Sequence, residues 1–209
     1  MITPNYTSLD GRIRFYNCDC MDLMNCGKVW DLAVVDPEFG IGIGKSARLV
    51  TDKGMKSKTW DDKPIDDKYF DVLFCISKNQ IIWGGNYYPL PANKHCFIWD
   101  KKQPEKLSFG MFDYAWTSFV GANKIFRQSA QKETVSWHPT SKPIQLYRWT
   151  LQNYAKAGDT ILDTHGGSMS SAIACHMEGF ELDICELDKE YFDAAVNRFK
   201  IYEQQQKLF

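Results

Sequence analysis

The chain of 209 residues is long enough for one domain with a full core, and its 25 Lys and Arg against 26 Asp and Glu exclude an overall basic field. A nucleic-acid partner would therefore have to contact a local patch. The sequence has no apolar run of about eighteen residues and no hydrophobic leader, so it predicts a cytoplasmic protein with no membrane partner.

The first predicted strand covers residues 12–17, where apolar and polar side chains alternate, and a short helix follows to about Met24. Asp19 lies between them. At a strand end in a nucleotide-binding sheet, a carboxylate can accept from an adenine amino group. N-capping of the short helix is an equally good interpretation of Asp19.

The apolar run Asp31–Val35 predicts an interior parallel strand, because such strands are buried on both faces. Asp36, Pro37, Glu38 and Phe39 follow at its carboxyl end, where ligands bind in open α/β sheets. Asp36 and the Pro37 carbonyl can each accept an N–H of one planar amino group, and Phe39 can stack on the ring that carries it. An ordinary Asp-Pro turn is the structural alternative.

Residues 40–63 show little apolar periodicity and predict a flexible loop with a local basic surplus. We expect this loop to contact a nucleic-acid backbone, and a solvated loop without a partner is the alternative. Its basic residues are Lys45, Arg48, Lys53, Lys56 and Lys58.

Asp66 and Asp67 open a predicted helix, and Gln80–Trp83 form the next buried strand. The glycines and aromatics of residues 84–88 follow that strand and could wall a pocket for an extruded base. Residues 104–135 read as short strands and loops, so a target-recognition insert there would be minimal.

His138-Pro139-Thr140-Ser141-Lys142-Pro143 precedes a predicted helix that Thr140 or Ser141 can cap, with Pro143 in its first turn. Lys142 opposes the helix dipole at this position. It therefore requires an anionic partner, such as the carboxylate of a cofactor.

Residues 160–163 predict a buried strand, and a turn of small residues leads from it into another helix. Backbone N–H groups of such a turn can face a ligand. The next strand ends at Glu186, about twenty residues on, where an acid grips ribose hydroxyls in dinucleotide-binding folds. Seven scattered cysteines without a C-x-x-C pair indicate reduced thiols and no metal site.

Three motifs follow one another along the chain: Asp-Pro-Glu-Phe at residues 36–39, His-Pro-Thr-Ser-Lys-Pro at residues 138–143, and the strand, small-residue turn and acid of residues 160–186. Their order resembles the β-group DNA amino-methyltransferases, which methylate N6 of adenine or N4 of cytosine, and most closely the small phage and mobile-element type. The resemblance covers nearly the whole chain. It implies one α/β domain over residues 1–209: a Rossmann-like, seven-stranded, mostly parallel sheet whose catalytic half precedes the cofactor half in a circular permutation. It also implies S-adenosyl-L-methionine as cofactor, DNA as partner, and a homodimer.

The resemblance also implies roles for single residues. Asp36, Pro37 and Phe39 would bind the target amine, with Asp36 bordering the cofactor as well. Lys142 would meet the methionine carboxylate, Glu186 would hold the ribose, and Asp19 would lie near the cofactor adenine. The residues implied to shape the cofactor turn are Asp163, His165, Gly167 and Ser168.

Three positions depart from the motifs of that family. Glu38 stands where the family has a second proline, His165 replaces a usual aromatic, and Met169 replaces a usual glycine. Met169 could crowd the methionine moiety, and Glu38 could disturb the amine clamp. The sequence thus predicts an adenine-N6 DNA methyltransferase, with a silent cofactor-binding homologue, an N4-cytosine enzyme and an RNA or protein amide methyltransferase as alternatives.

Overall fold

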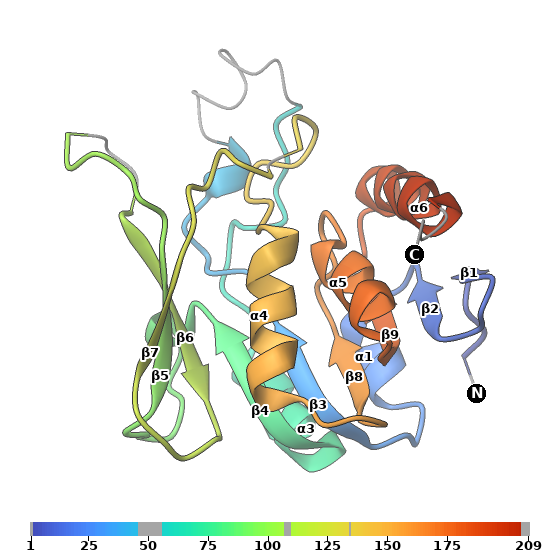
Figure 1. Ribbon diagram of the computed structural model, residues 1–209, viewed down its shortest axis with the longest axis horizontal. Helices are drawn as coiled ribbons and strands as arrows, with labels where there is room; N and C mark the ends of the chain where they lie inside the picture. The colour runs from blue at the N-terminus through green and yellow to red at the C-terminus, as the bar shows by residue number, and fades with distance from the viewer. Residues whose placement is uncertain (1, 46–55, 107–109, 134, 206–209) are drawn as a thin grey trace.

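The sheet that the sequence predicts forms from the buried apolar runs of the chain (Figure 1). The structure is a computed structural model that describes residues 2–45, 56–106, 110–133 and 135–205. The described residues form nine strands in the order β1-β2-β9-β8-β3-β4-β6-β5-β7. The strands are β1 (Tyr6–Thr7), β2 (Ile13–Tyr16), β3 (Trp30–Val35), β4 (Ser77–Trp83), β5 (Cys96–Asp100), β6 (Phe112–Thr117), β7 (Lys124–Arg127), β8 (Thr160–Asp163) and β9 (Glu181–Cys185).

Five neighbouring strands, β2, β9, β8, β3 and β4, run parallel. Strand β6 is antiparallel to both β4 and β5. The predicted α/β class is therefore confirmed, but the described sheet has two strands more than the expected seven. Two-residue β1 pairs with β2 and forms one edge of the sheet, and β7 pairs with β5 and forms the other.

Helices cover both faces of the sheet (Figure 1). Their bounds, with those of two short 3₁₀ segments, are α1 (Cys20–Met24), α3 (Asp67–Ile76), α4 (Ile144–Tyr154), α5 (Ser170–Glu178), α6 (Lys189–Gln204), η1 (Ile43–Lys45) and η2 (Gly85–Tyr87). One core lies between the sheet and α4, α5 and α6, and the other between the sheet and α1 and α3.

Strand β3 shows why its sequence does not alternate. Leu32 and Val34 pack into the core under α4–α6, whereas Ala33 and Val35 pack into the core under α1 and α3. Both faces of the strand are buried, so all four residues are apolar.

The predicted cap of α4 is wrong. Pro143 occupies the N-cap position and makes no side-chain capping bond, since its ring carries no hydrogen-bonding group. The Ser141 hydroxyl donates to Ser168 Oγ at 2.9 Å. Helix α4 ends at Tyr154, and Gly158 with φ of 89° turns the chain beyond that end.

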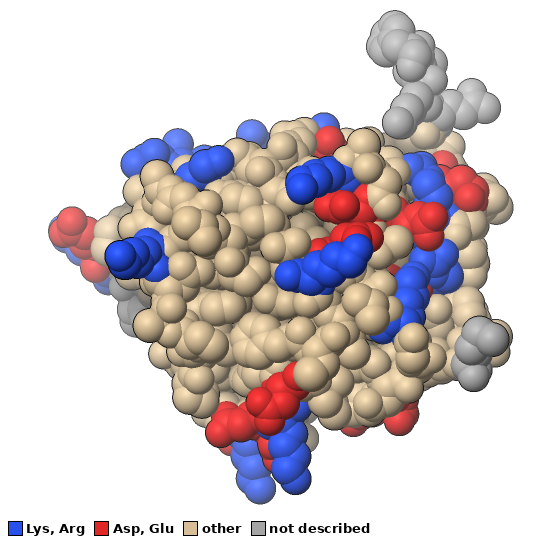
Figure 2. Space-filling view, turned by 90° about the horizontal axis from the view of Figure 1, so that it is seen from below, with Lys and Arg blue, Asp and Glu red and all other residues tan. Residues whose placement is uncertain are grey.

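The described residues of 104–135 supply β6 and β7 to the common sheet. A role of this segment in target recognition stays a prediction. In the part of the chain that the structure describes, no helix combines the length and apolarity of a membrane span. At the end seen from below, acidic and basic side chains are interspersed (Figure 2), in line with the net charge of −1.

Candidate functional site

The three motifs meet at the carboxyl edge of the parallel strands. Segment 36–39 follows β3, segment 84–88 follows β4, turn 164–169 follows β8, and Glu186 follows β9. Because β9, β8, β3 and β4 are parallel neighbours, their tips lie along one edge. The loop before α4 brings the His138–Pro143 motif to the same place.

Asp36 and Lys142 form an ion pair at this edge. The Lys142 ammonium donates to Asp36 Oδ2, while Oδ1 is buried and has no hydrogen-bond partner among the described residues. Burial raises the pKa of Asp36, an effect that the Lys142 charge only partly offsets. Asp36 thus supplies the anionic partner that the sequence requires for Lys142; contact of Lys142 with a cofactor carboxylate stays a prediction.

Two tyrosines after β4 hold segment 36–39 in place. The Tyr88 hydroxyl donates to the carbonyls of Pro37 at 2.9 Å and Glu38 at 3.2 Å, leaving capacity on the Pro37 oxygen for a second donor. The Phe39 ring stacks on Tyr87, with centroids 4.7 Å apart and planes 10° apart. A Cβ on Gly84 would lie 2.1 Å from the Phe39 ring, so this approach requires glycine.

The turn after β8 is held by Asp163. This buried carboxylate accepts from Ser171 Oγ at 2.5 Å and from the His165 backbone N–H at 3.1 Å. Burial raises its pKa to about 6 despite these bonds. Asp163 thus orients the turn through hydrogen bonds within the protein.

Glu186 closes the turn from β9. Its Oε2 accepts from the Gly167 N–H at 2.8 Å and its Oε1 from the Asp188 N–H at 2.8 Å. Burial raises the pKa of Glu186, and these two backbone donors partly oppose that rise. Each carboxylate oxygen retains a lone pair for a further donor, such as a ribose hydroxyl.

The His138–Pro143 motif packs directly on the turn after β8. A Cβ on Gly167, whose φ is 50°, would lie 2.9 Å from His138 Nε2. The Ser141 hydroxyl donates to Ser168 Oγ, and both residues are buried. One motif therefore contacts segment 36–39 through Lys142 and the turn after β8 through Ser141 and His138.

Met169 is one of the three departures from the family pattern, and the structure shows where its backbone and side chain lie. Its backbone lies in the left-handed region, with φ of 55° and ψ of 36°, where glycine is usual. Its side chain is fully buried in the core under α4–α6. Crowding of a cofactor by Met169 stays a prediction.

The other two departures contact each other. Glu38 Oε2 lies 3.2 Å from His165 Nε2, and both side chains are mostly buried. The carboxylate of Glu38 thus turns toward the turn after β8.

Asp19 and the basic loop have local partners in the structure. Asp19 is exposed and caps α1 by accepting from the Met21 N–H at 2.8 Å. Lys45 pairs with Asp62, Lys56 with Glu190 at 2.6 Å, and Lys58 with Asp188 at 2.5 Å. Arg48 and Lys53 lie outside the described residues. Contacts of these residues with a cofactor or DNA stay predictions.

Three contacts were missing from the sequence interpretation. Asp61, which is buried, accepts from the N–H groups of Gly40 at 2.8 Å and Ile43 at 2.9 Å and anchors the start of the basic loop. The sequence placed Tyr88 only in a pocket wall and did not predict its hydrogen bonds to the Pro37 and Glu38 carbonyls. The Glu38–His165 pair had one signal, namely that both residues depart from the family motifs.

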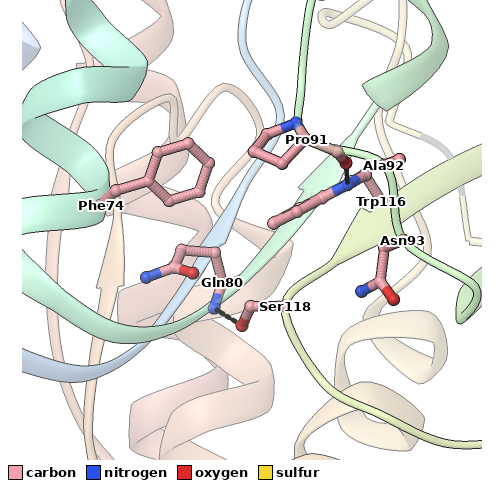
Figure 3. Close-up of a pocket in the computed structure, with 7 residues that line it drawn as sticks. All are labelled: Phe74, Gln80, Pro91, Ala92, Asn93, Trp116 and Ser118. Atoms are coloured by element: carbon pink, nitrogen blue, oxygen red, sulfur yellow. Dashed lines mark hydrogen bonds between the residues drawn. The ribbon is translucent and has the colours of Figure 1, made fainter.

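A cavity among the described residues lies away from this edge (Figure 3). It has a volume of about 380 Å³, and the Trp116 indole donates to the Pro91 carbonyl at its wall. None of its lining residues belongs to the predicted site: they are Phe74, Gln80, Pro91, Ala92, Asn93, Trp116 and Ser118.

Comparison with known proteins shows the family of this chain. Residues 25–197 match the family model for N6 and N4 enzymes described as DNA methylase. A search of curated protein sequences finds no match.

Three solved structures illustrate the shared fold. The M1.HpyAVI–SAM complex has a TM-score of 0.62 and 16% identity over 89% of this chain and 99% of that one. PvuII DNA methyltransferase (cytosine-N4-specific) has a TM-score of 0.66 and 13% identity over 99% of this chain and 90% of that one. TTHA0409 from Thermus thermophilus, complexed with S-adenosyl-L-methionine, has a TM-score of 0.57 and 15% identity over 92% of this chain and 95% of that one. With its family match over residues 25–197, the chain belongs to the DNA methylase family of N6 and N4 amino-methyltransferases.

Proposed function

We propose that this chain transfers a methyl group from S-adenosyl-L-methionine to the exocyclic N6 amine of adenine in DNA. The observation that carries the proposal is the free Oδ1 of Asp36, a buried acceptor without a partner among the described residues. A buried polar atom without a partner is costly, and an amino group from a substrate would satisfy it. Family membership supports DNA as the substrate.

The residues at the strand tips fit the proposed cofactor. Glu186 offers carboxylate oxygens at the end of β9, the Gly166-Gly167 turn brings backbone close to the same point, and Lys142 supplies a cation. M1.HpyAVI and TTHA0409 have each been solved with this cofactor. When bound, the cofactor supplies a methyl group activated on a sulfonium.

The chain's own residues position the amine. Asp36 Oδ1 and the Pro37 carbonyl each accept one N–H, which directs the nitrogen lone pair away from both acceptors. Since Phe39 already stacks on Tyr87, we place the base ring against these aromatics after extrusion from the duplex. The lysines of the basic loop would exchange their carboxylate partners for phosphates.

Adenine is proposed because the motif begins with Asp36, and Asp-led motifs are more usual for adenine in the family that the sequence resembles. N4 of cytosine is the second candidate. It is favoured by the fold match with PvuII methyltransferase, which is specific for that atom.

The test is transfer of labelled methyl from S-adenosyl-L-methionine to unmethylated DNA, with Asp36→Asn beside the wild type. We expect label in the wild-type DNA and a loss of at least about a thousandfold in the variant, which keeps the shape but loses the charged acceptor. Cofactor binding, followed by calorimetry, should survive in Asp36→Asn. Binding without transfer by the wild type to any DNA would instead support a silent homologue.

A further inference from the structure

The Glu38–His165 contact joins two functional segments. Glu38 lies between the amine acceptors and Phe39, and His165 lies in the turn after β8. A side-chain contact of 3.2 Å between them directly connects the proposed amine site to the proposed cofactor site.

Both ring nitrogens of His165 are engaged. Nε2 faces Glu38, and Nδ1 lies 2.9 Å from Thr164 Oγ1, which lies 2.5 Å from the Tyr69 hydroxyl. The ring also packs edge-on against Tyr69, with centroids 5.4 Å apart. His165 is therefore held in one orientation from β3, β8 and α3.

The charges around His165 favour its cationic form. Acidic groups face it from the segment after β3, from β8, from β9 and from α1, and Lys142 is paired with one of them. These groups are Glu38, Asp36, Asp163, Glu186 and the Cys20 thiol. Several buried acids at one edge require positive charge, and His165 lies among them.

We propose, on the basis of the proposed function, that Glu38 and His165 form a positioning pair whose charge attraction holds the amine-binding segment in register with the cofactor turn. The pair does in this chain what a second proline and an aromatic would do through rigidity and packing. Neither side chain touches the transferred group; they act through Asp36 and Pro37 on one side and the turn on the other.

The pair has a definite pH dependence. Burial opposes protonation of His165, but Glu38 and Cys20 outweigh it and raise the pKa of His165 well above 6.5; in return His165 lowers the pKa of Glu38 against the effect of burial. The pair is therefore charged at neutral pH. It is lost at high pH as His165 deprotonates through its raised pKa, and at low pH as Glu38 protonates through its lowered one.

The test compares wild type, Glu38→Gln, His165→Gln and the Glu38→Pro/His165→Phe double variant. We expect each single substitution to weaken cofactor binding and slow transfer by about tenfold, and the double variant to recover most of both. The alkaline limb of the transfer profile should move to lower pH in Glu38→Gln and be absent in the double variant. A double variant that transfers no better than the single variants, or an unmoved alkaline limb, would overturn the proposal.

A second measurement separates this proposal from the proposed function. NMR titration of the His165 imidazole needs neither DNA nor cofactor, and we expect its midpoint to fall in Glu38→Gln. As control, Asp10→Asn removes a carboxylate 3.7 Å from His176 and should leave His165 unchanged. Equal His165 midpoints in wild type and Glu38→Gln overturn the pair even if DNA is methylated. A wild type that methylates nothing but shows the shift overturns only the proposed function.

Discussion

Lys142 donates to Oδ2 of Asp36 across 106 positions of sequence and leaves Oδ1 of the same carboxylate free. The lysine thus compensates the charge of Asp36 without occupying the oxygen that we propose accepts from the substrate amine. Two motifs that are remote in the sequence become one site through this pair.

Lys142→Met should therefore cost both stability and activity. Removing one partner of a buried pair costs about 3–5 kcal/mol of unfolding free energy, because it leaves Asp36 uncompensated. Chemical denaturation measures this cost. Adding Asp36→Asn should restore most of the stability but no transfer; failure of the double variant to regain stability would contradict the pairing.

The same substitution should change the response to pH. Burial already raises the pKa of Asp36, and removal of Lys142 raises it further. A raised carboxylate pKa costs no stability below the unfolded value near 3.8 and a growing amount as pH rises through the folded value. We expect the stability deficit of Lys142→Met to be larger at pH 8 than at about pH 4, as denaturation at the two pH values will show. An equal deficit would argue against this account.

Tyr88→Phe should loosen the catalytic segment. The variant loses the hydroxyl that donates to the Pro37 and Glu38 carbonyls, at a cost of about 1 kcal/mol in stability. Transfer should slow by about tenfold, because small misplacements of reacting groups are costly. Tyr87→Phe is the matched control: it keeps the ring that stacks on Phe39 and should transfer at close to the wild-type rate.

At position 169, replacement by glycine should leave the protein more stable than replacement by alanine, the reverse of their usual order. Both replacements lose a buried side chain, at about 2–5 kcal/mol. Glycine, however, relieves a positive φ that alanine keeps, so Met169→Gly should be the more stable of the two by about 1 kcal/mol. Thermal unfolding of the two variants decides this; alanine as the more stable replacement would contradict the left-handed assignment.

Lys45 and Lys56 test the basic loop. If each contacts a phosphate, replacement by Ala should weaken DNA binding and reduce the slope of log affinity against log salt by about one. Lys189→Ala serves as control, since that exposed lysine pairs with Asp193 one turn further along α6. Unchanged slopes would place the DNA backbone elsewhere.

The fold class and family could be predicted because buried strands, glycine turns and motif order are local in the sequence. The strand count could not, since β1 is an edge strand of two residues whose pairing depends on neighbours in space. The cap of α4 was wrong for a similar reason: Ser141 finds its partner in Ser168, 27 residues away. Candidate site residues followed from strand ends, but contacts between loops, such as Glu38 with His165, required the structure.

The most direct test of the central claim is mass spectrometry of nucleosides from unmethylated DNA incubated with the protein and S-adenosyl-L-methionine. The account predicts N6-methyldeoxyadenosine, and none with Asp36→Asn. N4-methyldeoxycytidine instead would contradict the choice of adenine, and the absence of any methylated nucleoside would contradict DNA methylation by this chain.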